Sequence, residues 1–138
     1  MSAEEVVQAY LDTAFNMEKV EQKKDLMAYT IGPLKDAIAG ATDETIKTAY
    51  IDKRYKLQRF ALVDRRDRTP HETEITFQLS YKELPEGVSD EAQAVQIVTE
   101  NKVVAVKDNG VWFIREVVGN RTSFDFPVLP SSRITATP

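Results

Sequence analysis

The chain has no cysteine and only one histidine, His71, among its 138 residues. The absence of cysteine excludes disulfide bonds, a thiolate nucleophile and every zinc or iron–sulfur site that uses thiolate ligands. A single histidine is too few for a histidine-rich metal site. No apolar run approaches the roughly 20 residues that a membrane-spanning helix requires. The sequence therefore predicts no membrane-spanning segment, and it points to no metal or other cofactor.

Short motifs of well-known chemistry are also missing. The chain has no glycine-rich phosphate-binding loop, no Gly-x-Ser-x-Gly elbow and no His-Glu-x-x-His motif. His71 follows Pro70 at the expected entrance of a strand and has no orienting partner in the sequence. A lone histidine of this kind fits a surface turn better than a catalyst. We therefore assign no catalytic residue from the sequence.

Length and composition are those of one globular domain. Hydrophobic residues make up 42% and charged residues 29% of the chain, which argues against wholesale disorder. We predict a single domain over residues 1–120. Residues 121–138 contain three prolines and a Ser/Thr-rich end, which favours a tail that is partly docked or disordered. The first residues lack the layout of a signal peptide, so a cytoplasmic protein and an exported one with its leader removed both remain open.

Charge changes sign along the chain, although the net charge is only −4. Residues 51–70 carry seven bases and three acids, and residues 71–100 carry seven acids and one lysine. A basic stretch can attract phosphate or an acidic partner. Here acids are interleaved with the bases, which favours a solvated strand with ion pairs across strands. We accordingly predict no nucleic-acid partner.

The first fifty residues have a helical pattern. Ser2 and Glu5 have the spacing of a capping box, and apolar residues then recur at i, i+3 and i+4, which predicts a helix over 3–16. A second helical stretch follows, with a break near Gly32-Pro33 and a stop at Gly40. Thr42 or Asp43 would cap a short third helix that continues through Ile46 to Tyr50.

From residue 55 the apolar period changes from 3.6 to 2, which predicts strands. We expect a first strand over 55–63, a polar turn over 64–70, and a second strand in which Ile75, Phe77, Leu79 and Tyr81 share one face. A third strand should span 94–107 with a bulge around Glu100-Asn101. Asp108-Asn109-Gly110 predicts a tight turn, followed by a strand from Val111 to Val118. The fold class is therefore α+β, with three N-terminal helices packed on a curved, mainly four-stranded antiparallel sheet.

The last hairpin is apolar on both faces. Residues 103–106 are consecutively apolar, and residues 111–114 repeat this across the turn. One face would meet the helices, and the other needs a cover, either a second copy of the chain or the aromatic part of the tail. The alternative is a sheet that curls until both faces are internal. We favour a homodimer whose interface includes Trp112, Phe113, Arg115, Phe124 and Phe126.

The order of three helices and a long-stranded sheet resembles the nuclear-transport-factor-two-like superfamily of curved, cystatin-like α+β cones. The closest piece is the hairpin Lys-Asp-Asn-Gly-Val-Trp-Phe-Ile at 107–114, which is similar to that of small bacterial members. The resemblance covers 2–118 in element order. It implies helices over the concave side of the sheet, and dimerisation through the outer side in several members. A bacterial cell-envelope location would follow if a leader had been removed.

Three functions remain open at this point. We favour a non-catalytic interaction or assembly domain that associates with itself through the sheet. The second possibility is a binder of a small apolar ligand in the cone cavity. The third is an isomerase- or dehydratase-like enzyme, which requires a buried ionisable group in that cavity. The residues expected to line the cavity are Tyr10, Tyr55, Phe77 and Tyr81.

Overall fold

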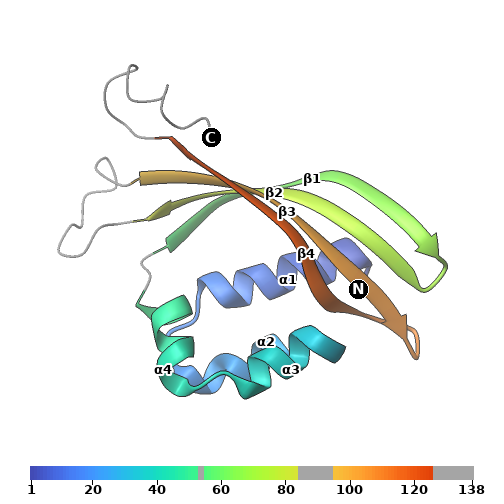
Figure 1. The fold of residues 1–138 in the computed structure, drawn as a ribbon, viewed down its shortest axis with the longest axis horizontal. Helices are drawn as coiled ribbons and strands as arrows, with labels where there is room; N and C mark the ends of the chain where they lie inside the picture. The colour runs from blue at the N-terminus through green and yellow to red at the C-terminus, as the bar shows by residue number, and fades with distance from the viewer. Residues whose placement is uncertain (53–54, 84–94, 126–138) are drawn as a thin grey trace.

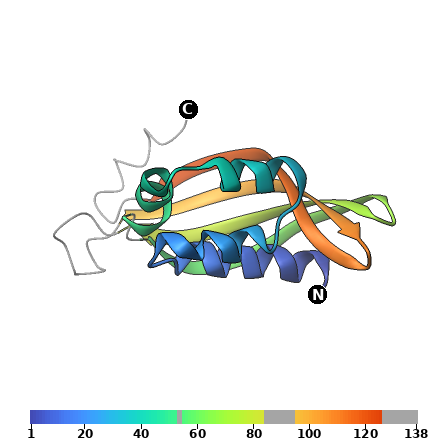
Figure 2. The ribbon, with the colours of Figure 1, turned by 90° about the horizontal axis from the view of Figure 1, so that it is seen from below.

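The computed structural model describes residues 1–52, 55–83 and 95–125 (Figure 1). The expected interface residue Phe126 and residues 127–138 of the predicted tail lie outside these ranges, whereas residues 121–125 of that tail are described and belong to the last strand. Helices come first in the chain and a four-stranded antiparallel sheet follows, so the α+β class predicted from the sequence is confirmed. The helices lie on one face of the sheet, which arches over them (Figures 1 and 2).

The first helix begins and ends where the sequence predicts. It is α1, Ala3–Phe15, and it starts with a complete capping box. The backbone N–H of Glu5 donates to the Ser2 hydroxyl at 3.1 Å, and the Ser2 N–H donates to the Glu5 carboxylate at 2.8 Å. Both donors would otherwise lack a partner at the helix end.

The second helical stretch is divided in two, so the described residues hold four α-helices rather than three. The remaining helical elements are η1 (Val20–Gln22), α2 (Lys23–Met27), α3 (Gly32–Gly40), α4 (Asp43–Ile46) and the π-helical turn η2 (Lys47–Ile51). The chain between α2 and α3 runs beside the last strand. There the Ile31 N–H donates to the carbonyl of Ile114, and the Ile114 N–H donates to the carbonyl of Tyr29. Gly32 then adopts a φ of 62°, a left-handed conformation that favours glycine.

The sheet is a simple meander. Its strands are β1 (Tyr55–Thr69), β2 (Glu72–Glu83), β3 (Val95–Asp108) and β4 (Val111–Asp125), paired in the order β1-β2-β3-β4. Asn109 and Gly110 have φ values of 51° and 80° in the last turn, which explains why the sequence uses this pair there. β4 continues to Asp125, seven residues beyond the predicted end at Val118, because its backbone keeps pairing with β3.

The edge strands are bulged and the central strands are regular. β2 and β3 pair without a break, so the bulge predicted around Glu100-Asn101 is wrong. The register shifts instead place one extra residue at each of five positions on the edge strands, Gln58, Val63, Arg68, Arg115 and Val118. Bulges lengthen and bend a strand relative to its neighbour. The two longer edge strands can therefore curve around the helical layer.

The predicted end of the first strand is also wrong. β1 continues to Thr69, so the predicted polar turn over 64–70 is reduced to Pro70 and His71. Residues 64–69 are exposed on the edge of the sheet and pair with β2 all the same. Because this part of the strand is exposed, its sequence needs no alternation of apolar and polar residues. The bulge at Val63 also changes which residues face the inner side of the sheet beyond it.

The core lies between the helices and the inner face of the sheet. Ile75, Phe77 and Leu79 of β2 are buried on this face, and Tyr81 is half-buried beside them. Their packing partners on α1 are Ala3, Val6, Val7 and Leu11. A second cluster joins the helices to one another through Ala14, Met17, Leu26, Ile38 and Ile46. The two clusters leave space between them, and that space is the candidate site.

Candidate functional site

A cavity of about 270 Å³ lies between α1, the inner face of the sheet and the α3–η2 side of the helical layer. Its wall is mostly aliphatic and aromatic. Val117 and Ala49 are exposed, and they mark the side on which the cavity meets solvent. The lining residues are Val7, Tyr10, Leu11, Ala14, Phe15, Leu34, Ala49, Tyr50, Tyr55, Phe77, Leu79, Asn101, Val103, Ile114 and Val117.

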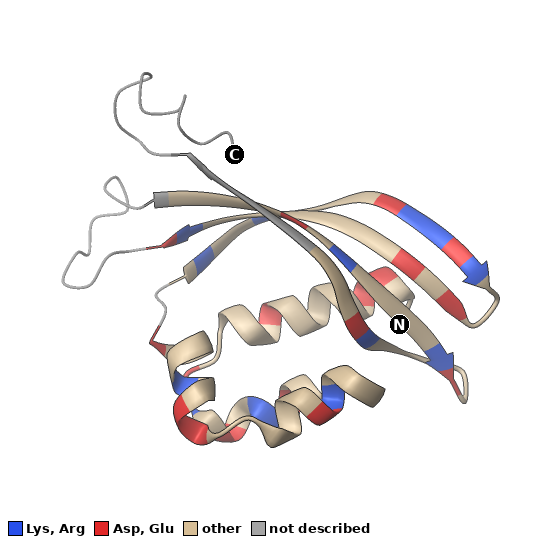
Figure 3. Ribbon diagram, viewed as in Figure 1, with Lys and Arg blue, Asp and Glu red and all other residues tan. Residues whose placement is uncertain are grey.

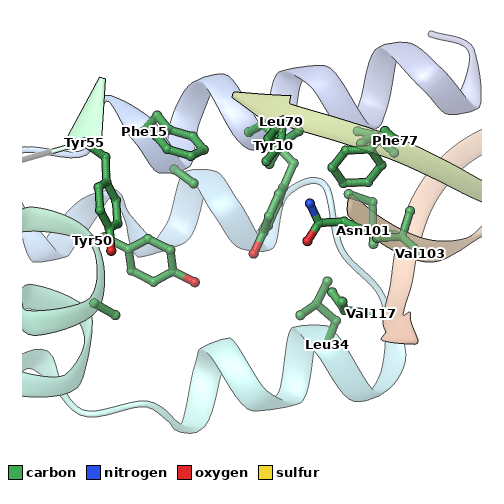
Figure 4. A pocket seen from close by; sticks show the side chains of 15 residues that line it. Tyr10, Phe15, Leu34, Tyr50, Tyr55, Phe77, Leu79, Asn101, Val103 and Val117 are labelled. Atoms are coloured by element: carbon green, nitrogen blue, oxygen red, sulfur yellow. The ribbon is translucent and has the colours of Figure 1, made fainter. Parts of the chain in front are cut away.

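Four side chains of this apolar wall carry polar atoms, those of Tyr10, Tyr50, Tyr55 and Asn101. Tyr10 of α1, Tyr50 of η2 and Asn101 of β3 turn their polar ends toward the middle of the cavity (Figure 4). Burial raises the pKa of the Tyr10 phenol far above its ordinary value, and the nearby Tyr50, which hydrogen bonds with it, raises it further. Tyr10 is therefore a neutral phenol at any physiological pH.

A hydrogen bond to a neighbouring side chain on the same strand orients Asn101. It is 8% exposed, and its amide nitrogen donates to the Thr99 hydroxyl at 2.8 Å. Thr99, Asn101 and Val103 share the inner face because they alternate along β3. We missed Asn101 from the sequence, although its alternation with Val103 on a predicted strand is a signal that would have placed it on the inner face.

An aromatic group closes the end of the cavity near Tyr55. The ring of Tyr81 packs against Tyr55 with centroids 4.9 Å apart, and against Phe15 at 5.2 Å. Tyr55 and Phe15 line the cavity, whereas Tyr81 supports them. Tilted and edge-to-face pairs at these distances are favourable. Of the four residues expected to line a cavity, the structure brings Tyr10, Tyr55 and Phe77 together, and Tyr81 lies behind them.

The described wall carries no Asp, Glu, His, Lys or Arg side chain. An isomerase-like or dehydratase-like mechanism needs a general base within reach of the substrate. Three tyrosines are the only ionisable groups in this part of the wall. Among the residues that the structure describes, no cluster of three or more His, Cys, Asp or Glu side chains could hold a metal ion either.

A group of ion pairs joins all four strands on the outer face of the sheet, and we call it the outer ion network. It consists of Arg68, Glu72, Glu74, Lys102, Arg115 and Glu116. Charged residues gather on these parts of the strands in Figure 3. Val104 is 0% exposed and lies directly between Glu74 and Glu116 in the strand register. The side chains of the network therefore surround Val104 without any second chain.

The hairpin residues expected at an outer interface lie in different places. Trp112 packs partly buried on the helix side, where Arg65 and Lys107 lie over its ring at 5.7 and 5.9 Å from the centroid. Phe113, one residue on, points to the opposite face. Arg115 belongs to the outer ion network, and the backbone of Phe124 pairs with Ile97. Trp112 and Phe113 thus do not share one surface.

The outer ion network should make the free energy of unfolding decrease at acidic pH. Hydrogen bonds from Arg68 lower the pKa values of both Glu72 and Glu74, with smaller contributions from Arg115 and Lys102. A lowered folded-state pKa contributes stability at neutral pH that is lost as pH falls through that pKa. We expect the free energy of unfolding to decrease below pH 4.5, the ordinary value for glutamate, and Arg68→Gln to weaken this dependence. Urea unfolding at pH 7 and pH 3.5 measures it.

The control for this experiment is Arg59→Gln. Arg59 is exposed on the same strand, lies opposite Ser80 and makes no ion pair within the described ranges. This variant should keep the acid dependence of the wild type. If the free energy of unfolding fell equally between pH 7 and pH 3.5 in Arg68→Gln and in the wild type, hydrogen bonds from Arg68 would not be what lowers the pKa values of these carboxylates.

No protein-family model matches the chain, and no curated protein matches its sequence. Among the described residues, no helix is long and apolar enough to cross a membrane. The functional proposal therefore follows from the geometry of the cavity.

Proposed function

We propose that this domain binds a small apolar molecule in the cavity between α1 and the sheet. The observation that carries the proposal is an apolar cavity of about 270 Å³ with only a few polar groups on its wall. Small-molecule sites are typically concave, mostly apolar and equipped with a few placed polar groups. Well-packed interiors rarely leave such a volume unfilled. This function was the second possibility raised by the sequence.

The volume sets the size of the ligand. An apolar cavity of roughly 150 Å³ holds benzene. A cavity of about 270 Å³ therefore suits a molecule of two fused rings, such as naphthalene. The aromatic wall formed by Phe15, Tyr55 and Phe77 offers flat surfaces for stacking against such rings.

Binding is tested with naphthalene and a matched pair of valine substitutions. Val103 is 4% exposed and lines the cavity, whereas Val111 is 51% exposed and lies outside it. We expect Val103→Phe to fill the cavity and to lower naphthalene affinity about tenfold or more, with Val111→Phe unchanged. Isothermal titration calorimetry measures the affinities, and circular dichroism checks that each variant is folded.

A second variant covers the case in which Val103→Phe does not fold. Val117→Phe enlarges an exposed residue at the mouth, on the same strand as the control Val111, so it leaves the core intact. It should slow or weaken naphthalene binding. A wild-type protein that does not bind naphthalene, or folded variants that bind it equally well, would contradict the proposal.

Self-association through the outer sheet face, which the sequence favoured, stays a prediction. The outer ion network surrounds Val104, so this buried position needs no partner chain to cover it. Val111 is half exposed on the same hairpin, and an apolar contact there remains available to a second copy. Membership of the nuclear-transport-factor-two-like superfamily is likewise proposed, and it is supported by the element order, the curved sheet and the cavity between the sheet and the helices.

A further inference from the structure

The cavity wall is uncharged over the described residues, and this limits what can enter it. An ionised group that leaves water needs an opposite charge or several hydrogen bonds in the protein. Among the described residues, four cations adjoin lining residues in sequence and none lines the cavity. Lys102 pairs with Glu74 and Arg115 pairs with Glu72 on the outer side of the sheet, and the side chains of Lys35 and Lys56 are exposed. A carboxylate or ammonium inside the cavity would therefore stay unpaired.

The wall does provide for one uncharged polar group. The Tyr10 and Tyr50 hydroxyls and the Asn101 amide come from three separate elements and turn toward the same part of the cavity (Figure 4). Leucine, valine and phenylalanine side chains make up most of the remaining wall. A ligand oxygen placed at this point has phenol and amide partners, while the rest of the ligand contacts only apolar or aromatic groups.

We propose that the cavity selects neutral ring compounds that carry one hydrogen-bonding oxygen, and that Tyr50 determines this specificity. The inference rests on the proposed function, because it names the chemical class of the ligand for the same cavity. Tyr50 is partly buried, and it sits on the π-helical turn η2 next to Ala49, the exposed lining residue on the side where the cavity meets solvent. From this turn Tyr50 can contact an incoming oxygen without displacing the core.

The tyrosines suit a neutral ligand better than an anion. Burial raises the pKa of the Tyr10 phenol, and a neutral phenol can donate to an uncharged oxygen or accept from a hydroxyl. The cavity should discriminate between ligands because a buried polar group without a hydrogen-bond partner is unfavourable, whether it belongs to the protein or to the ligand. A plain hydrocarbon leaves the tyrosine hydroxyls without a ligand partner, and an anion brings a charge that the wall does not balance.

Three probes of one size separate these possibilities. Naphthalene has no polar group, 2-naphthol carries a neutral hydroxyl at pH 7 since phenols titrate near 10, and 2-naphthoate carries a negative charge. We expect 2-naphthol to bind about tenfold more tightly than naphthalene. We expect 2-naphthoate to bind at least a hundredfold more weakly than 2-naphthol. Calorimetric titration of the full chain measures all three.

The role of Tyr50 is tested with Tyr50→Phe. This variant should lose most of the preference for 2-naphthol over naphthalene, whereas Val111→Phe, which lies outside the cavity, should keep this preference. If Tyr50→Phe loses naphthalene as well, Tyr10→Phe repeats the comparison. Wild-type protein that binds 2-naphthoate as well as 2-naphthol, or variants that keep the 2-naphthol preference, would overturn the inference. If the wild type binds no naphthalene, the proposed function fails first.

Discussion

Replacing Ile75 with alanine is expected to lower the free energy of unfolding by about 3 kcal/mol. Ile75 is 0% exposed and lies on the central strand β2, between Arg65 of β1 and Val103 of β3 in the register. Three methyl or methylene groups would be removed from a site in the main core cluster, between the sheet and α1. Such a site cannot collapse easily, so the lost packing is not recovered.

Urea unfolding followed by circular dichroism measures this effect. The control is Val111→Ala, because Val111 is apolar, lies on a strand and is 51% exposed. It should cost about 0.5 kcal/mol or less. Ile75 does not line the cavity, so Ile75→Ala should leave naphthalene affinity unchanged in the folded protein. A loss below about 1 kcal/mol for Ile75→Ala would mean that the inner face of β2 is not the centre of the core.

A charge at Val104 is expected to be even more destabilising, by about 4 kcal/mol for Val104→Asp. Val104 is 0% exposed although it lies on the outer face, and its register neighbours are the carboxylates Glu74 and Glu116. A third carboxylate between them would be desolvated and repelled at the same time. The cations of the outer ion network are already hydrogen-bonded or paired with other carboxylates.

Two further variants separate charge from polarity in this experiment. Val104→Asn has nearly the same shape as Val104→Asp without the charge, and it should be clearly less destabilising in the same urea unfolding assay. Val111→Asp places the charge at an exposed position and should change stability by about 0.5 kcal/mol. If Val104→Asp were as mild as Val111→Asp, Val104 would not be enclosed by the outer ion network.

The features that the sequence predicted correctly are those that local residues determine. The capping box at Ser2 and Glu5 defines the start of α1 through two hydrogen bonds within four residues. Asn109 and Gly110 define the last turn through their positive φ values. The alternation over 75–81 identifies the inner face of β2 because this central strand is paired on both sides without bulges toward β3.

The features that the sequence did not predict depend on contacts between distant segments. The bulges at Arg115 and Val118 arise where β4 bends toward the helices, and nothing in their own residues distinguishes them from a regular strand. The sequence predicts the break of the second helical stretch near Gly32-Pro33, but it does not predict the hydrogen bonds that join Tyr29 and Ile31 to Ile114 at this break. The charged half of β1 was assigned to a turn because exposed edge strands carry little apolar signal.

The candidate site was predictable only in the part that local periodicity determines. Tyr10 and Phe77 lie on faces that periodicity identifies, and both line the cavity. Tyr81 shares the face of Phe77 but lies behind Tyr55, and only the packing of three aromatic rings decides this. The sequence predicts a bulge around Glu100-Asn101, whereas Asn101 lies on the inner face of a regularly paired stretch and donates a hydrogen bond to Thr99.

The bulged edges of the sheet also bear on fibril formation. Growth by strand addition needs a long, regular row of free backbone N–H and C=O groups at a sheet edge. β1 interrupts that row at Gln58, Val63 and Arg68, and it carries clustered charges on its distal half. β4 has part of its edge occupied by the Tyr29–Ile31 segment of the same chain. The meander is therefore built so that concentrated protein resists edge-to-edge polymerisation.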